Sequence, residues 1–176
     1  MAGDYGKCVC RDSVIGNGET TGGGEFVTPE RIFSICNLIA LAGWVLLIAF
    51  GRRRWVTSLV TGFAIPLILS LVYAALIAEH WRDPGGGSFS TLAGVALLFS
   101  NPWKLLAGWV HYLAFDLFTG TWEVRDAMDK GVPHLLVIPS LALTFLFGPL
   151  GLLLYFGTRA AVTRSAGLQP GRAAQL

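Results

Sequence analysis

Asp116 and His111 are the two side chains whose chemistry and surroundings most directly suggest a function. Both lie in the apolar stretch 109–118, which has the composition of a membrane-spanning helix. A charged side chain at the centre of such a helix costs on the order of 2.5–3.5 kcal/mol on insertion scales, so ionisable residues there usually belong to a functional site. The pair therefore predicts a polar site within the membrane, for ligand contact, proton transfer or a fixed ion pair.

Helical spacing decides how these two groups are arranged. Tyr112, Asp116 and Glu123 share one helix face, because they lie four and then seven residues apart. His111 lies about 140° around the helix from Asp116, so the two cannot point at one neighbouring helix. We expect them to flank an elongated, aromatic-lined cavity that suits an apolar ligand with polar ends. Two structural alternatives stay open: Asp116 as a buried partner of Asn37 or Tyr112, and His111 as a packing residue.

Other polar residues are expected around the same cavity. Asn37 in the first predicted helix falls at a depth similar to that of His111, and His134 begins the last predicted helix nearer to Asp116. The candidate residues for binding or orienting a substrate are Asn37, Trp109, Tyr112, Glu123, Arg125 and His134. The alternatives are interhelical hydrogen bonding for Asn37 and an interfacial position for Glu123 and Arg125. No HxxxH or ExxH spacing and no nucleotide or haem motif is present, so neither a metal nor a cofactor is predicted.

Composition places the chain among membrane proteins. It is 53% hydrophobic and 14% charged, whereas soluble domains carry roughly 25% charged residues. A net charge of +2 is too small to indicate a nucleic-acid partner. Trp and Tyr residues fall near the expected helix ends, as in the aromatic belts of membrane proteins. The three cysteines indicate no disulfide framework, although Cys8 and Cys10 could bind a metal or carry a lipid.

The hydrophobic pattern predicts an all-α polytopic membrane protein. Four spanning helices are expected at about 31–50, 55–78, 103–122 and 132–156, and a short interfacial or re-entrant helix at 90–99. Thr28 and Pro29 are typical of a helix start, and Pro66 should kink the second helix. The predicted organisation is a flexible polar tail (1–27), a four-helix domain (28–158) and a short basic tail (159–176).

Location follows from the same features. The N-terminal stretch has neither the apolar core of a signal peptide nor the Arg/Ser richness of a transit peptide. The Ala-, Gly- and Leu-rich composition, with Arg favoured over Lys, is typical of bacteria. We therefore expect a bacterial inner (plasma) membrane protein, with the triplet Arg52–Arg54 facing the cytoplasm.

Several motifs resemble the plant neoxanthin-synthase-like family, which is named for an abscisic-acid-deficient mutant and is also widespread in bacteria. They are Phe33-Ser34-Ile35-Cys36-Asn37, Trp109-Val110-His111 followed by Asp116-Leu117-Phe118, then His134 and Pro149-Leu150-Gly151. The resemblance covers about 26–160 and implies a small four-span membrane protein. The loop 80–87 and the Gly-rich N-terminal stretch are not features of the plant members.

The resemblance implies a carotenoid- or isoprenoid-type ligand. The family reaction converts a carotenoid 5,6-epoxide to an allene without redox change, so it needs an acid for the epoxide oxygen and a base for a vinylic proton. Asp116 as acid and His111 as base, or the reverse, would fit a cofactor-independent isomerase.

Two other classes of function stay open. One is a non-catalytic membrane scaffold or a lipid- or pigment-binding protein, and the other is a small transporter. The expected partners are membrane lipid, the apolar ligand, and either a second copy of the chain or another membrane enzyme.

Overall fold

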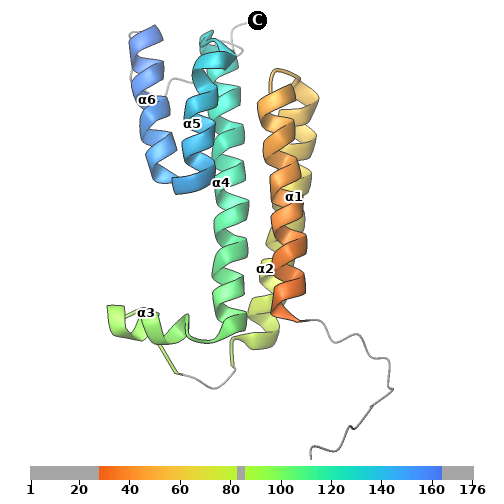
Figure 1. The fold of residues 1–176 in the computed structure, drawn as a ribbon, viewed down its shortest axis with the longest axis vertical. Helices are drawn as coiled ribbons and strands as arrows, with labels where there is room; N and C mark the ends of the chain where they lie inside the picture. The colour runs from red at the N-terminus through yellow and green to blue at the C-terminus, as the bar shows by residue number, and fades with distance from the viewer. Residues whose placement is uncertain (1–27, 83–85, 164–176) are drawn as a thin grey trace, which may run out of the picture.

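A computed structural model describes residues 28–82 and 86–163 of the chain, and every regular element in these two ranges is helical (Figure 1). The elements, in chain order, are α1 (Pro29–Phe50), the π-helix η1 (Val56–Ala64), α2 (Ile65–His80), α3 (Leu92–Leu98), α4 (Pro102–Lys130), α5 (His134–Phe147) and α6 (Pro149–Thr163). The all-α fold class is confirmed. The predictions for 1–27, including those for Cys8 and Cys10, and for 164–176 lie outside the described residues.

Three long helical segments run side by side along the molecule, with α4 at the centre of the packing (Figure 1). We call the end where α1 and α4 begin the Pro29 end, and the end that carries the turn between α1 and η1 the Arg52 end. Local capping explains the helix starts. The Thr28 side chain accepts a hydrogen bond from the Arg31 backbone N–H, and Asn101 Oδ1 accepts one from the Trp103 N–H at 2.9 Å. In both cases proline is the first helical residue, where its missing N–H costs nothing.

A π-helix lies directly before Pro66, where the sequence predicted a kink. The nine residues of η1 lead directly into α2, where Pro66 is the second residue. Wide π-helical turns are found where the regular α-helical hydrogen bonding is interrupted. The hydroxyl of Thr61 donates to the Val56 carbonyl oxygen five residues earlier, at 3.3 Å, which satisfies one backbone acceptor of this segment.

The prediction of one fourth spanning helix at 132–156 is wrong, because two helices, α5 and α6, occupy this stretch. Gly148 lies between them with φ +46° and ψ −95°, a conformation that favours glycine. Pro149 follows and cannot donate the hydrogen bond that would continue α5. The chain therefore reverses, and α5 and α6 form a hairpin beside the half of α4 nearest the Arg52 end (Figure 1). We call this pair the α5–α6 hairpin.

Four spanning helices are therefore not confirmed. Among the described residues, two helices are long and apolar enough to cross a membrane, namely α1 and the continuous segment Val56–His80. Helices α5 and α6 have 14 and 15 residues, or about 21 and 22 Å at 1.5 Å per residue. That is shorter than the ~30 Å of hydrocarbon in a bilayer.

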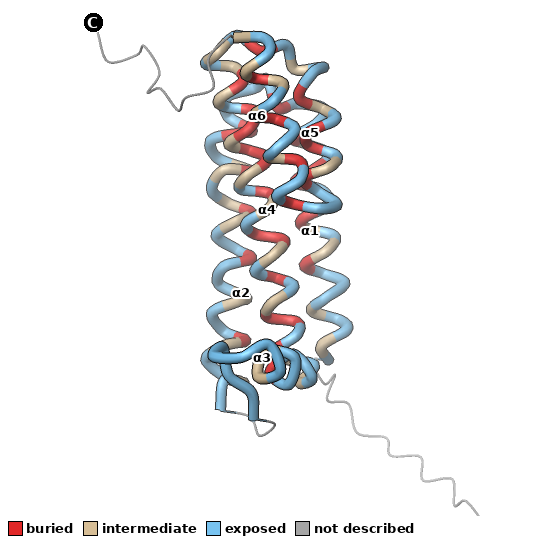
Figure 2. Tube along the Cα trace, turned by 90° about the vertical axis from the view of Figure 1, so that its left-hand side faces the viewer, coloured by how far each residue is buried: buried red, intermediate tan, exposed pale blue. Residues whose placement is uncertain are grey.

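The ends of the helical region differ only slightly from expectation. Helix α3 lies across the Pro29 end of the bundle, where a short lateral helix was expected at 90–99 (Figures 1 and 2). The last described helix continues to Thr163, beyond the expected limit of the helical domain at residue 158.

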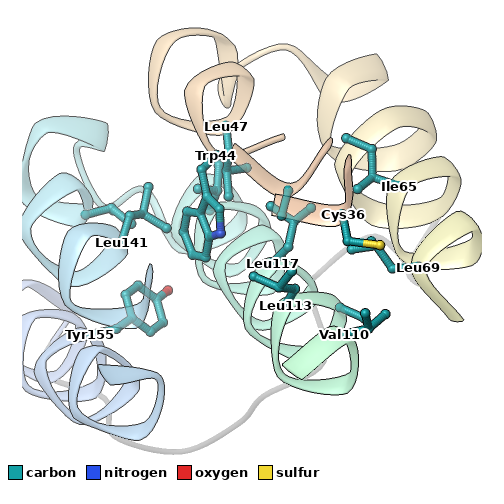
Figure 3. Packing of buried hydrophobic residues seen from close by; sticks show 14 of the residues in the cluster. Cys36, Trp44, Leu47, Ile65, Leu69, Val110, Leu113, Leu117, Leu141 and Tyr155 are labelled. Atoms are coloured by element: carbon teal, nitrogen blue, oxygen red, sulfur yellow. The ribbon is translucent and has the colours of Figure 1, made fainter. Parts of the chain in front are cut away.

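The apolar core lies where α1, α2, α4 and the hairpin meet, and buried positions follow the inner faces of the helices (Figure 2). Trp44 of α1 reaches between Leu117 of α4 and Leu141 of α5 (Figure 3). Gly120 makes room for this indole, because a Cβ at that position would lie 2.6 Å from Trp44 Cη2. The core thus holds α4, which carries most of the candidate residues, against α1, α2 and the hairpin.

Candidate functional site

An apolar groove runs along the half of α4 nearest the Pro29 end. Two adjoining cavities of about 260 and 320 Å³ share Leu105 and Trp109, so we treat them as one surface and call it the α4 groove. It is lined by Pro29, Glu30, Phe33, Phe99, Pro102, Leu105, Leu106, Gly108, Trp109 and Tyr112. Most of these side chains are apolar or aromatic, which suits a hydrophobic ligand.

The aromatic wall of the groove is held by a polar contact with α1. Trp109 Nε1 donates a hydrogen bond to Asn37 Oδ1 at 3.0 Å. The Trp109 ring also packs against Phe33 and Tyr112, with ring centroids 5.6 and 5.4 Å apart. Asn37 therefore orients the indole, and the structure brings Asn37, Trp109 and Tyr112 together as the sequence predicted.

Asp116 lies one helical turn beyond Tyr112, the last residue of α4 that lines the groove, and beside the tip of the hairpin. It is the middle residue of the 29-residue helix α4 and is half-buried. Tyr112, which lines the groove, is one helical turn away and donates its hydroxyl hydrogen to the Phe145 carbonyl oxygen at 3.2 Å. Gly148 at the tip faces the carboxyl group, because a Cβ there would lie 2.9 Å from Asp116 Oδ1.

Two features mark the surroundings of this carboxyl group: a nearby partial positive charge, and a carboxyl oxygen without a hydrogen-bond partner among the described residues. Asp116 lies next to the residue that precedes α6, and a helix N-terminus carries partial positive charge. Oδ2 of Asp116 is buried and has no hydrogen-bond partner in the part of the chain that the structure describes. Buried polar atoms are usually satisfied, so this oxygen is available to a ligand.

Glu123 is buried two turns further along α4, against α5. Its Oε1 accepts a hydrogen bond from Thr144 Oγ1 at 2.9 Å, and its Oε2 has no partner among the described residues. Helices α5 and α6 are very close at this level, since a Cβ on Gly151 of α6 would overlap the backbone N and the hydroxyl of Thr144 of α5. Glu123 is thus a buried group under the hairpin and not a residue of the membrane interface.

The structure does not bring His111 together with Asp116. His111 is exposed and stacks on Phe115 with ring centroids 4.5 Å apart, and its ring lies 5.6 Å from that of Tyr73 on α2. It lies on a different side of α4 from the hairpin, in agreement with the 140° separation expected from helical geometry. Neither His111 nor Asp116 lines the two cavities of the α4 groove.

The remaining predicted site residues lie at the Arg52 end. One ring nitrogen of His134, Nε2, is 2.9 Å from the carbonyl oxygen of Ile48 in the last turn of α1. Arg125 is exposed and borders a small cavity that it shares with Arg54 and Asp129. Neither residue approaches Asp116, so both belong to the packing and surface of this end.

Sequence reasoning missed a buried polar cluster between α4 and α6. The Tyr155 hydroxyl donates to Asp126 Oδ2 at 2.6 Å, and Arg159 Nε lies 3.1 Å from the same oxygen. Arg159, expected in the C-terminal tail, is fully buried. The available signal was spacing: Glu123 and Asp126 lie three residues apart and Tyr155 and Arg159 four apart, so each pair shares a helix face.

The matches to known proteins cover most of the helical part of the chain. Residues 31–155 match the model of a family described as ABA DEFICIENT 4-like. Over 141 residues the chain is 24% identical to Protein ABA DEFICIENT 4, chloroplastic, from Arabidopsis thaliana, with 76% of this chain and 62% of that protein covered. The chain thus spans less than two thirds of that relative's length. No solved structure gives a significant match.

Proposed function

Because this chain belongs to the ABA DEFICIENT 4-like family, we propose that it is an integral membrane protein that binds an elongated apolar ligand of the carotenoid or isoprenoid type. The ligand lies in the α4 groove and places a polar end group at Asp116. One observation carries this proposal: an apolar, aromatic groove reaches Tyr112, and one helical turn further along α4 lies a half-buried carboxyl group whose Oδ2 has no partner among the described residues.

The dimensions of the groove support a long ligand. From Pro102 to Tyr112, the stretch of α4 that lines the groove, the helix rises about 15 Å at 1.5 Å per residue. The groove lies on the flank of α4 between α1 and α3, so a ligand enters laterally, from the hydrocarbon of the bilayer. The two ends of the groove carry different polar groups, Glu30 at one and Tyr112, with Asp116 a turn beyond it, at the other, and this difference fixes the direction in which an asymmetric ligand binds.

The proposed chemistry is isomerisation by one carboxyl group. Asp116 gives its proton to an epoxide oxygen of the ligand as the ring C–O bond opens. The Asp116 carboxylate then removes a vinylic proton, the allene forms, and the acid is regenerated with no net change in atoms or electrons. This scheme replaces the pairing of Asp116 with His111, which stacks against α2 on another side of α4.

The location also remains a proposal. Helix α1 and the segment Val56–His80 are long and apolar enough to cross a membrane, and the composition indicates a bacterial plasma membrane. The polar middle of α4 is then shielded from lipid by the hairpin and by α1.

The test is expression of the chain in bacterial hosts that accumulate plain, hydroxylated or epoxidised carotenoids, with chromatography of the extracted pigments. An isomerised product that is lost in Asp116→Asn would support the enzymatic proposal. The matched control is Asp129→Asn, the same change at an exposed carboxylate on the same helix. Unchanged pigments, with none retained on the purified protein, would contradict both catalysis and binding.

A second function, transport, has one specific observation in its favour. The hairpin interrupts the last helical stretch and directs the start of α6 toward the middle of α4, as discontinuous helices do at the binding sites of secondary transporters. Pigment that co-purifies unchanged would indicate a binding protein, whereas ligand movement across proteoliposome membranes would favour transport.

A further inference from the structure

A line of acidic side chains follows α4 away from the groove and under the hairpin. Asp116, Glu123 and Asp126 are separated by seven and three residues, so all three lie on the face that packs against α5 and α6. The α4 groove lies on the Pro29 side of Asp116, and the line lies on the Arg52 side. The two features therefore meet at the Asp116 carboxyl group.

In the part of this line nearest Asp116, two buried carboxyl oxygens lack a hydrogen-bond donor among the described residues. Glu123 is fully buried, and only its Oε1 is engaged, by the Thr144 hydroxyl. Its Oε2 and Asp116 Oδ2 are both buried without a partner among the described residues. A buried charge that lacks a partner is costly, and a proton resting on either carboxyl group would remove its charge.

The outer part of the line reaches the surface. The Asp126 side chain is 12% exposed near the Arg52 end, and Tyr155 donates to its Oδ2 at 2.6 Å. The fully buried Glu123 lies one helical turn from Asp126 on the same face of α4. The phenol thus contacts a carboxyl group that touches the surface and that is one turn from a carboxyl group that does not.

The charges around Glu123 support the same conclusion. Asp116 and Asp126 lie on the same face of its own helix, Tyr155 and Arg159 of α6 contact Asp126, and at the level of Glu123 α5 contributes the Thr144 hydroxyl. Arg159 makes an ion pair with Asp126. Within the described structure no ion pair of this kind compensates Asp116 or Glu123.

We propose that Asp126, Tyr155 and Glu123 form a proton route from the Arg52 end of the protein to Asp116. A proton taken up by Asp126 passes to the Tyr155 oxygen, while the Tyr155 hydroxyl proton passes to Glu123. The step from Glu123 to Asp116 covers about 10.5 Å of helix rise, and the two unpartnered oxygens are the acceptors for a hydroxyl or water that bridges it. The proposal rests on the proposed role of Asp116 as a proton donor, because the groove itself opens on hydrocarbon.

The experiment is infrared spectroscopy of the purified full-length chain after a rapid change from H₂O to D₂O. The carbonyl stretch of protonated Asp116 is identified as the component missing in Asp116→Asn, and its shift reports exchange of that proton. We expect Glu123→Gln to slow this exchange by an order of magnitude or more. The substitution keeps an acceptor for the Thr144 hydroxyl, and Tyr155→Phe is a second variant that removes only a hydroxyl group.

The control and the contrary results are well defined. Asp129→Asn should exchange at the wild-type rate, because this exposed carboxylate lies off the route. Wild-type exchange in both Glu123→Gln and Tyr155→Phe would overturn the route, and so would the absence of any protonated Asp116 signal. No ligand is used, so the route can fail while pigment isomerisation still depends on Asp116, and the two proposals are judged separately.

Discussion

Replacing Gly151 with alanine tests the close contact on which the α5–α6 hairpin depends. A Cβ at this position would overlap the backbone N and hydroxyl of Thr144 and lie 2.5 Å from the Ser140 carbonyl oxygen. Two of these three atoms belong to the α5 backbone, so the two helices must separate. Forcing an extra methyl group into a packed core costs about 1–3 kcal/mol, and moving Thr144 also weakens its hydrogen bond to buried Glu123.

The matched control is Gly157→Ala on the same helix, where nothing lies within 4 Å of the added Cβ. That change should be neutral or stabilising by up to about 1 kcal/mol, because alanine is the better helix former. The two variants should thus differ by roughly 1–4 kcal/mol when these estimates are combined. Thermal unfolding in detergent, followed by circular dichroism, compares them. Equal midpoints for Gly151→Ala and Gly157→Ala would refute the close approach of α5 and α6 at this level.

Three further predictions concern the hairpin and the site. In membrane vesicles of a cysteine-free variant, Arg53→Cys and Ala161→Cys should react with an impermeant thiol reagent from the same side, because α6 returns to the Arg52 end. Thr144→Val should lower the free energy of unfolding by about 1–3 kcal/mol, since it leaves the buried Glu123 carboxyl group without its donor; denaturation in detergent measures this. His111→Phe should leave pigment binding and conversion unchanged in the carotenoid-producing hosts, because this ring stacks outside the α4 groove.

Each of these has a control and a contrary result. Glu30→Cys, at the start of α1, should react from the opposite side, and labelling of Ala161→Cys from that side would contradict a hairpin that returns. Thr158→Val changes a hydroxyl that bonds only to the backbone of its own helix and should cost less than Thr144→Val. Loss of pigment conversion in His111→Phe, with the fold intact, would restore His111 to the site.

Local signals in the sequence predicted the parts of the fold that depend on neighbouring residues. Thr28 and Asn101 are helix caps whose partners lie two or three residues away, so the starts of α1 and α4 were readable. The reversal at Gly148 was not, because 132–156 is apolar throughout and proline alone does not separate a kink from a turn. Pro139 lies inside α5 without ending it, whereas Pro149 follows a glycine with positive φ.

The site shows the same division. Helix phase placed Tyr112 and Asp116 on one face and His111 on another, and the structure agrees. Which face meets the groove depends on the packing of α1 and the hairpin around α4, and periodicity carries no such information. Arg159 was assigned to a tail because a basic residue near the end of the apolar stretch resembles a flanking charge. In the structure it is buried and forms an ion pair with Asp126 on α4.

In the membrane arrangement that we propose, the limited length of the α5–α6 hairpin makes the two leaflets of the bilayer unequal for this protein. In the leaflet at the Arg52 end, the hairpin covers the flank of α4, and lipid meets a closed protein surface. In the leaflet at the Pro29 end, the same flank is uncovered and presents Trp109 and the α4 groove. A molecule dissolved in one leaflet can therefore slide sideways into the groove, whereas an identical molecule in the other leaflet must first cross the midplane. The distribution of the ligand between leaflets, as well as its total amount, would then set how fully the groove is occupied.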